Sequence, residues 1–191
     1  MGIFDRLKKG NKHYTLANLQ LNARLQPMHR FELEDMLEEG LKKKKLGEVV
    51  GGGTTLMPEG GISGCNIEFN IEMEKTDEFI TFLRQIHIIP KGSSISINDA
   101  NIEIGCAEGM ALHLNGTDLS PEVYQNYDIN ELIEQLDNTL ADIALRLSHW
   151  EGDTETSIYY YGKNYVEMEE KILEITKKHP LCEKCRVEQI A

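Results

Sequence analysis

The fold is decided by the stretch CNIEFNIEM at positions 65–73 and by the segment that follows it. Apolar and polar residues alternate in this stretch without interruption, which is typical of a strand with one buried and one exposed face. Beyond Thr76, a candidate N-cap, the apolar residues recur at helical spacing as far as Pro90. Ile95 and Ile97 then begin another strand. The pattern therefore predicts a strand, a helix and a strand in that order.

The residues before this stretch predict three more elements. Apolar residues alternate with polar ones from Asn18 until Pro27 ends the strand. A helix is predicted over 31–45, with carboxylates early and four lysines late, the order that the helix dipole favours. A strand that contains the run Gly51-Gly52-Gly53 follows at 47–56 and returns through a turn to Cys65. The first half thus has the order βαββαβ, which resembles the ferredoxin-like superfold.

The second half repeats this order, and such a duplication implies two similar domains. A short extra strand is predicted at Ile102 and Ile104. The predicted strand, helix, hairpin, helix and strand then lie at 110–114, 128–143, 145–150 with 158–161, 164–179 and 185–190, and Asp128 and Asn164 are the candidate N-caps of the two helices. The resemblance implies an α+β fold of two ferredoxin-like βαββαβ halves, with antiparallel sheets and helices packed on one face. It implies no particular activity, because this fold hosts many. We expect a basic N-terminal arm at 1–15, the first half at 16–98 and the second at 99–191. A single α+β domain with one longer continuous sheet is the alternative.

The composition describes an acidic chain. Its 191 residues carry a formal charge of −12, and because positions 1–15 carry +3, the rest carries −15. Such a surface repels phosphate backbones, which argues against nucleic acid as a partner and favours a basic protein. No apolar run reaches the length of a membrane span, and the N-terminus lacks a leader pattern. We therefore expect a cytoplasmic protein without a membrane span.

The glycine run in Gly51-Gly52-Gly53-Thr54-Thr55 could present backbone N–H groups to an anion. A phosphate loop, however, needs a Lys-Ser/Thr pair that enters a helix, and here a turn and a strand follow. Permissive backbone geometry, or a close approach by another group, explains the glycines better. A small enzyme or ligand-binding protein with a cleft near Gly51–Thr55 is kept as an alternative.

A C-x-x-C motif lies near the C-terminus. Cys182 and Cys185, with His179, supply three ligands at most, whereas a structural zinc site needs four. Cys65 and Cys106 are expected to face the core of the first half. A redox C-x-x-C usually opens a helix whose dipole lowers the thiol pKa, but this one follows a helix. We expect inert thiols and no metal, and keep a structural zinc protein as a second alternative.

Signatures of catalysis are absent from the sequence. The six histidines form no H-x-x-x-H or H-x-H pair, and no G-x-S-x-G, H-E-x-x-H or dinucleotide motif occurs. We therefore expect a protein that is not an enzyme and that uses no cofactor.

A polar sheet face remains as the candidate site. Amides and carboxylates on a rigid sheet suit a polar, basic protein partner, and aromatic residues often anchor interfaces. The candidate partner-binding residues are Asn18, Gln20, Asn22, Arg24, Asn66, Glu68, Asn70 and Glu72 on the first half, and Trp150, Tyr159 and Tyr161 on the second hairpin. The predicted function is a non-catalytic, acidic, cytoplasmic protein-binding module, in its most specific form an immunity or antitoxin-like protein against a basic toxin. A homodimer through open faces or edge strands is also compatible with the sequence.

Overall fold

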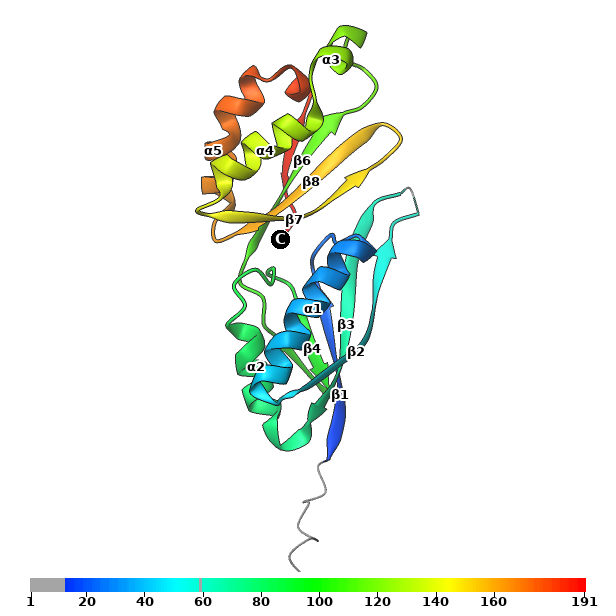
Figure 1. Ribbon diagram of the computed structural model, residues 1–191, viewed down its shortest axis with the longest axis vertical. Coiled ribbons are helices and arrows are strands. Elements are labelled where there is room, and N and C mark those ends of the chain that lie inside the picture. The colour runs from blue at the N-terminus through cyan, green and yellow to red at the C-terminus, as the bar shows by residue number, and fades with distance from the viewer. Residues whose placement is uncertain (1–12, 59) are drawn as a thin grey trace, which may run out of the picture.

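A computed structural model describes residues 13–58 and 60–191. It contains two antiparallel sheets, each with its own helices, and the two halves follow one another along the long axis of the molecule (Figure 1). The expected basic arm falls mostly outside the described residues, and the first strand already begins at Tyr14. Among the described residues no helix is long and apolar enough to cross a membrane.

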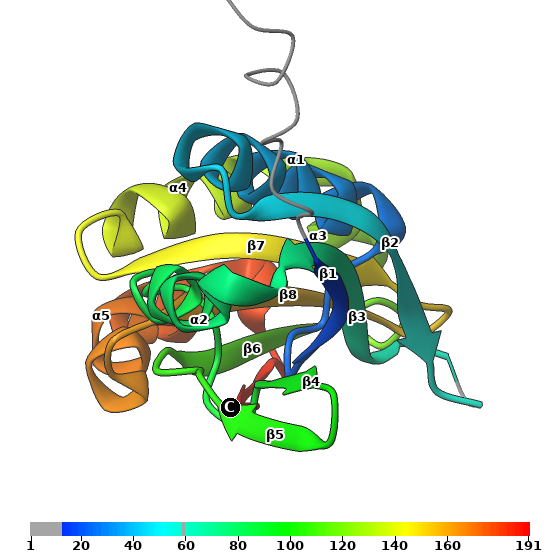
Figure 2. The ribbon, with the colours of Figure 1, turned by 90° about the horizontal axis from the view of Figure 1, so that it is seen from below.

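The first half forms a five-stranded sheet with the strand order β2-β3-β1-β4-β5. Its elements are β1 (Tyr14–Leu21), α1 (Pro27–Lys44), β2 (Gly47–Leu56), β3 (Ile62–Glu72), a 3-10 turn (Met73–Lys75), α2 (Thr76–Arg84), β4 (Ser94–Ile97) and β5 (Ala100–Glu103). Figure 2 shows α1 and α2 on the same side of this curved sheet, whose other side carries no helix.

The second half forms a four-stranded sheet with the order β7-β8-β6-β9. Its elements are β6 (Glu108–Asn115), α3 (Pro121–Asn126), α4 (Ile129–Leu140), β7 (Ala144–Glu151), β8 (Glu155–Gly162), α5 (Tyr165–Lys178), a 3-10 turn (Pro180–Cys182) and β9 (Arg186–Gln189). This order is that of β2-β3-β1-β4 in the first half, so the prediction of two βαββαβ halves is confirmed. The alternative of one continuous sheet does not describe the structure.

Three local predictions are corrected by the structure. The first helix begins at Pro27 rather than Phe31, because proline suits the first helical position and its missing N–H costs nothing there. Thr76 is the first residue of α2 rather than its N-cap, and its hydroxyl donates to the carbonyl of Met73 at 2.8 Å. The short strand expected near Ile102 is β5, which pairs with β4 and so extends the first sheet, although 99–191 was assigned to the second half.

Side-chain caps begin the two long helices of the second half. The Asp128 carboxylate accepts the backbone N–H of Asn130 at 2.8 Å, and the Asn164 side chain accepts that of Glu167 at 3.0 Å. Both caps were predicted from the sequence, and each satisfies an N–H group that the helix itself leaves unpaired.

The cores of the two halves are not independent. One buried cluster lies between α4, α5 and the second sheet and includes Leu112, Leu136 and Tyr160. The other fills the first half, yet it also contains Tyr159 and Tyr161 from β8. The first half therefore covers the part of the second sheet's helix-free face that bears these two tyrosines.

The glycines of β2 have a steric explanation. Arg30 on α1 is only 6% exposed and forms an ion pair with Glu34 directly beneath Gly52. A Cβ on Gly52 would lie 2.5 Å from the carbonyl oxygen of Asn66 and 2.6 Å from both Arg30 Nη1 and Glu34 Oε1. Gly52 thus allows a buried ion pair to approach the strand, which agrees with a structural role for the glycine run.

We predict that Gly52→Ala destabilises the protein by about 1–3 kcal/mol, because the added methyl group overpacks a site bounded by backbone. Gly51→Ala is the matched control, since its Cβ would meet only Glu68 Oε2 at an ordinary 3.4 Å. Urea unfolding followed by circular dichroism measures both. Equal midpoints for the Gly52 variant and the wild type would contradict this explanation.

Candidate functional site

The helix-free side of the first sheet presents a continuous polar surface. Leu19, Ile67 and Ile95 point into the core, so the residues that alternate with them point outward. Strand register aligns these outward residues in two rows, Gly51–Glu68–Asn18–Ser96–Asn101 and Gly53–Asn66–Gln20–Ser94–Glu103. We call these two rows, together with Asn70 and its neighbour Glu48, the amide–carboxylate face.

Hydrogen bonds between strands hold several of these side chains in place. Asn66 Nδ2 donates to Asn18 Oδ1 at 3.1 Å, and Ser96 Oγ donates to Asn101 Oδ1 at the same distance. The amides are therefore partly fixed before any partner binds, which reduces the entropy cost of binding.

The charge of this sheet has a single sign. The five strands of the first half contain four glutamates and no lysine, arginine or histidine: Glu48, Glu68, Glu72 and Glu103. Glu72 is the last residue of β3 and is largely buried, with Lys75 Nζ 3.4 Å from its carboxylate. Leu16 on β1 is 69% exposed and Tyr14 is half exposed, so an apolar corner adjoins the carboxylates.

The structure brings most of the predicted site residues together. Six of the eleven lie on the helix-free side of the first sheet: Asn18, Gln20, Asn66, Glu68, Asn70 and Glu72. Asn22 follows the end of β1 and is engaged locally, because its side-chain amide donates to the carbonyl of Lys91 at 2.9 Å. The remaining four, Arg24, Trp150, Tyr159 and Tyr161, lie where the two halves meet.

Arg24 and the tyrosines hold the halves together and are not free for a partner. The backbone N–H of Arg24 donates to the Tyr161 hydroxyl at 2.9 Å, and its guanidinium carbon lies 5.7 Å from the centre of the Tyr159 ring. Tyr159 is 2% exposed and Tyr161 is fully buried, while Trp150 packs beside them against the first core. The sequence signal for this burial is the run of three tyrosines at 159–161, because it places aromatic rings on both faces of one strand.

The junction between the halves also contains residues that the sequence analysis did not single out. Ser148 Oγ accepts the backbone N–H of Gln26 at 3.2 Å and lies 3.0 Å from His29 Nδ1. The rings of His29 and His149 meet edge to face with their centres 5.3 Å apart. Burial lowers the pKa of His29, and the neighbouring His149 and Arg146 lower it further, while Glu32 opposes them.

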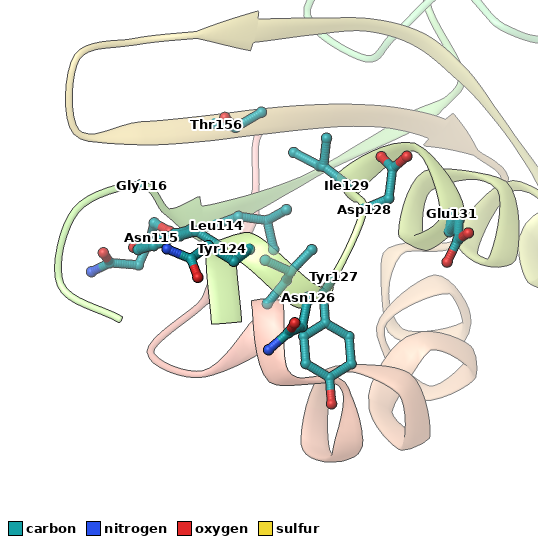
Figure 3. Close-up of a pocket in the computed structure, with 12 residues that line it drawn as sticks. Leu114, Asn115, Gly116, Tyr124, Asn126, Tyr127, Asp128, Ile129, Glu131 and Thr156 are labelled. Atoms are coloured by element: carbon teal, nitrogen blue, oxygen red, sulfur yellow. The ribbon is translucent and has the colours of Figure 1, made fainter. Parts of the chain in front are cut away.

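A pocket of about 640 Å³ opens at the far end of the second half (Figure 3). Its walls come from the end of β6, from α3 and the start of α4, and from Thr156 on β8. Tyr124 and Tyr127 lie here. The Tyr124 hydroxyl accepts the N–H of Leu119 at 3.1 Å, and the Tyr127 ring meets His179 edge to face. Tyr124 thus holds the loop after β6, and Tyr127 contacts the segment that follows α5.

The alternative sites receive little support from the geometry. Of the residues Gly51–Thr55, Thr55 alone borders a described pocket, a shallow one of about 290 Å³. Within 13–58 and 60–191, no group of three or more His, Cys, Asp or Glu side chains is arranged to hold a metal ion. Cys65 is buried in the first core as expected, whereas Cys106 is exposed.

The similar proteins that comparisons find are solved structures of low sequence identity. No protein-family model matches the chain, and no curated protein matches it. An unknown protein from Galdieria sulphuraria is similar in structure, with 12% identity and a TM-score of 0.30, over 93% of this chain and 97% of its own. The regulatory subunit of aspartate kinase from Thermus thermophilus has 14% identity and a TM-score of 0.29, over 87% and 95% of the two chains. Its counterpart from Thermus flavus has 12% identity and a TM-score of 0.29, over 85% and 93%. Function has to be argued from the geometry of the chain itself.

We predict that the folded state loses stability as the pH falls from 7 toward 5 and that His29 contributes to this loss. Its lowered pKa keeps the imidazole neutral in the fold, so the unfolded chain, with its ordinary pKa near 6.5, takes up the proton first. The free energy of unfolding, measured by urea titration at several pH values, should fall less steeply in His29→Gln.

The control for this measurement is His87→Gln, because His87 is exposed and lies outside the junction. It should keep the wild-type slope. If the His29 variant also keeps that slope, proton uptake by His29 does not contribute to the loss of stability, and the prediction is wrong.

Proposed function

We propose that this protein is a non-catalytic binding protein that holds a basic protein partner on the amide–carboxylate face. One observation carries the proposal: the five strands of this sheet bear four glutamates and no basic residue, on a side that no helix covers. The corresponding side of the second sheet packs against the first half at Tyr159 and Tyr161, and its remaining part carries Arg186 beside Glu155 and Glu188, so it lacks the single-sign charge of the amide–carboxylate face.

The shape of this face favours a macromolecule over a small ligand. The pocket at its end is shallow, and Gly51 and Gly53 leave the backbone of β2 unshielded by side chains. A small molecule is usually bound in a concave site that encloses it, whereas a broad open sheet suits a broad partner surface. Ser94 and Ser96 have no histidine on the same sheet that could activate them, which supports binding without catalysis.

The charge favours a basic partner. Opposite charges steer two proteins together and select against wrong partners, and this effect weakens as salt screens it. The same charge opposes self-association through this face, because two copies would bring their carboxylates against each other. The most specific form of the proposal is an immunity-type protein that covers a basic toxin in the cytoplasm.

Charge reversal with a matched control tests the proposal. The variant Glu48→Lys/Glu68→Lys/Glu103→Lys changes the face, and the control Glu122→Lys/Glu134→Lys/Glu170→Lys changes three exposed glutamates on the helices of the second half by the same charge. Each protein, with a photo-crosslinker at Gln20, is used to capture partners from lysate of the source cell at low and at high salt. Captured proteins are identified and their affinities are measured with purified material.

The expected result is a basic protein that the wild type and the control bind equally and that the face variant binds at least 10-fold more weakly. A 10-fold loss corresponds to about 1.4 kcal/mol, a modest effect for three reversed charges at an interface. Binding should weaken at high salt. Equal binding by the face variant, or an equal loss in the control, would overturn the proposal.

A further inference from the structure

The C-x-x-C motif of the second half closes a tight turn. Cys182 is the last residue of the 3-10 turn after α5, and the backbone N–H of Cys185 donates to its carbonyl at 3.0 Å. Glu183 has φ −59° and ψ 128°, and Lys184 has φ 61°, which are the angles of a type II turn. A lysine in a left-handed conformation is unfavourable, so the surrounding structure holds this turn in place.

This turn brings the two sulfur atoms together. The Cα atoms at the ends of a β-turn lie within about 7 Å, and disulfides join Cα atoms that are about 4.4–6.8 Å apart. The two thiols are free, and they lie close enough for each to shift the pKa of the other. A disulfide can therefore form here without moving the strands on either side.

The two cysteines differ in environment and hence in reactivity. Cys182 is 3% exposed and packs in the core of the second half with Leu181, whereas Cys185 is only partly buried. The neighbouring Cys182 thiol lowers the pKa of Cys185 to about 7, and the Cys185 thiol together with burial raises the pKa of Cys182. Because the thiolate is the reactive form, Cys185 is the attacking group at neutral pH. The thiol partner here replaces the helix dipole that the sequence motif lacks.

We propose that Cys182 and Cys185 form a redox-active dithiol that exchanges with low-molecular-weight disulfides of the glutathione type. The Cys185 thiolate attacks one sulfur of the disulfide, forms a mixed disulfide and releases the first thiolate. Cys182 then gives its proton to that thiolate, and its sulfur attacks the Cys185 sulfur and releases the second. Two protein thiols are oxidised to one intramolecular disulfide, and the small disulfide is reduced to two thiols.

Metal binding by the same pair is less consistent with the geometry. A structural zinc site needs four ligands, and the nearest histidine in sequence, His179, already accepts the backbone N–H of Leu181 on its Nδ1 at 3.3 Å. The described residues offer no third or fourth ligand in a metal-site arrangement.

The turn is also connected to the pocket of the second half. Lys184 Nζ donates to the carbonyl of Asp118 at 2.8 Å, which ties the turn to the loop after β6. Leu181, next to Cys182, forms part of the pocket wall. Oxidation of the dithiol thus acts on a segment that joins α5, this pocket and β9.

The test uses the full chain, reduced and then equilibrated at neutral pH with mixtures of oxidised and reduced glutathione. Acid quenching, alkylation and peptide mass spectrometry then show whether each cysteine is a free thiol, a mixed disulfide or part of a protein disulfide. The expected product is a disulfide between Cys182 and Cys185, with loss of two hydrogens, in the wild type and in Cys106→Ser. Cys182→Ser should stop at a mixed disulfide on Cys185. In the wild type, the rate of alkylation of Cys185 should rise with pH, with a midpoint near pH 7.

Three outcomes would overturn the proposal. The first is glutathione on exposed Cys106 while the pair stays reduced in excess oxidised glutathione. The second is a disulfide between two chains instead of one within the turn. The third is stoichiometric, tightly held zinc in the wild type after incubation with zinc alone, lost in Cys182→Ser. Thermal unfolding of each variant shows whether it is folded. Because the cysteine pair lies in the second half, the result is independent of partner binding by the amide–carboxylate face of the first half.

Discussion

The packing of one sheet face of the second half onto the first half is the constraint on which the rest of the structure depends. A βαββαβ unit covers one side of its sheet with its own helices and leaves the other side bare. In the second half that bare side carries Tyr159 and Tyr161, which join the core of the first half. The hydrogen bond from the Arg24 N–H to the Tyr161 hydroxyl fixes the segment between β1 and α1 on this surface. The second sheet is thereby enclosed around these two tyrosines, and the first keeps an open face.

The two halves share a strand order but not the chemistry of their helix-free faces. Equivalent positions on β3 and β8 hold amides and carboxylates in one case, such as Asn66 and Glu68, and tyrosines in the other. Burying unpaired amides and carboxylates is costly, whereas burying aromatic rings is favourable. The duplication therefore yields one face suited to internal packing and one suited to water or to a polar partner. The dithiol of the second half lies outside both faces, so the proposed binding surface and the proposed redox site occupy separate parts of the molecule.

Much of the architecture could be predicted because it follows from local patterns. Alternation identified β1 and β3, and the side-chain caps at Asp128 and Asn164 located the starts of α4 and α5. The start of α1 was misplaced because Pro27 can end a strand or begin a helix, and neighbouring residues do not distinguish the two. The reactivity proposed for the cysteine pair does not follow from the motif alone, since it depends on how the turn places the two thiols relative to each other.

Local sequence patterns were enough to predict the βαββαβ order of each half, the polar character of the first sheet and the acidic net charge. Tertiary structure decided which polar and aromatic residues remain accessible. Arg24, Tyr159 and Tyr161 were candidates for a partner and instead hold the two halves together. Alternation specifies toward which side of a strand a residue points. What covers that side depends on contacts between segments more than a hundred residues apart, such as those from Gln26 to Ser148 and His149.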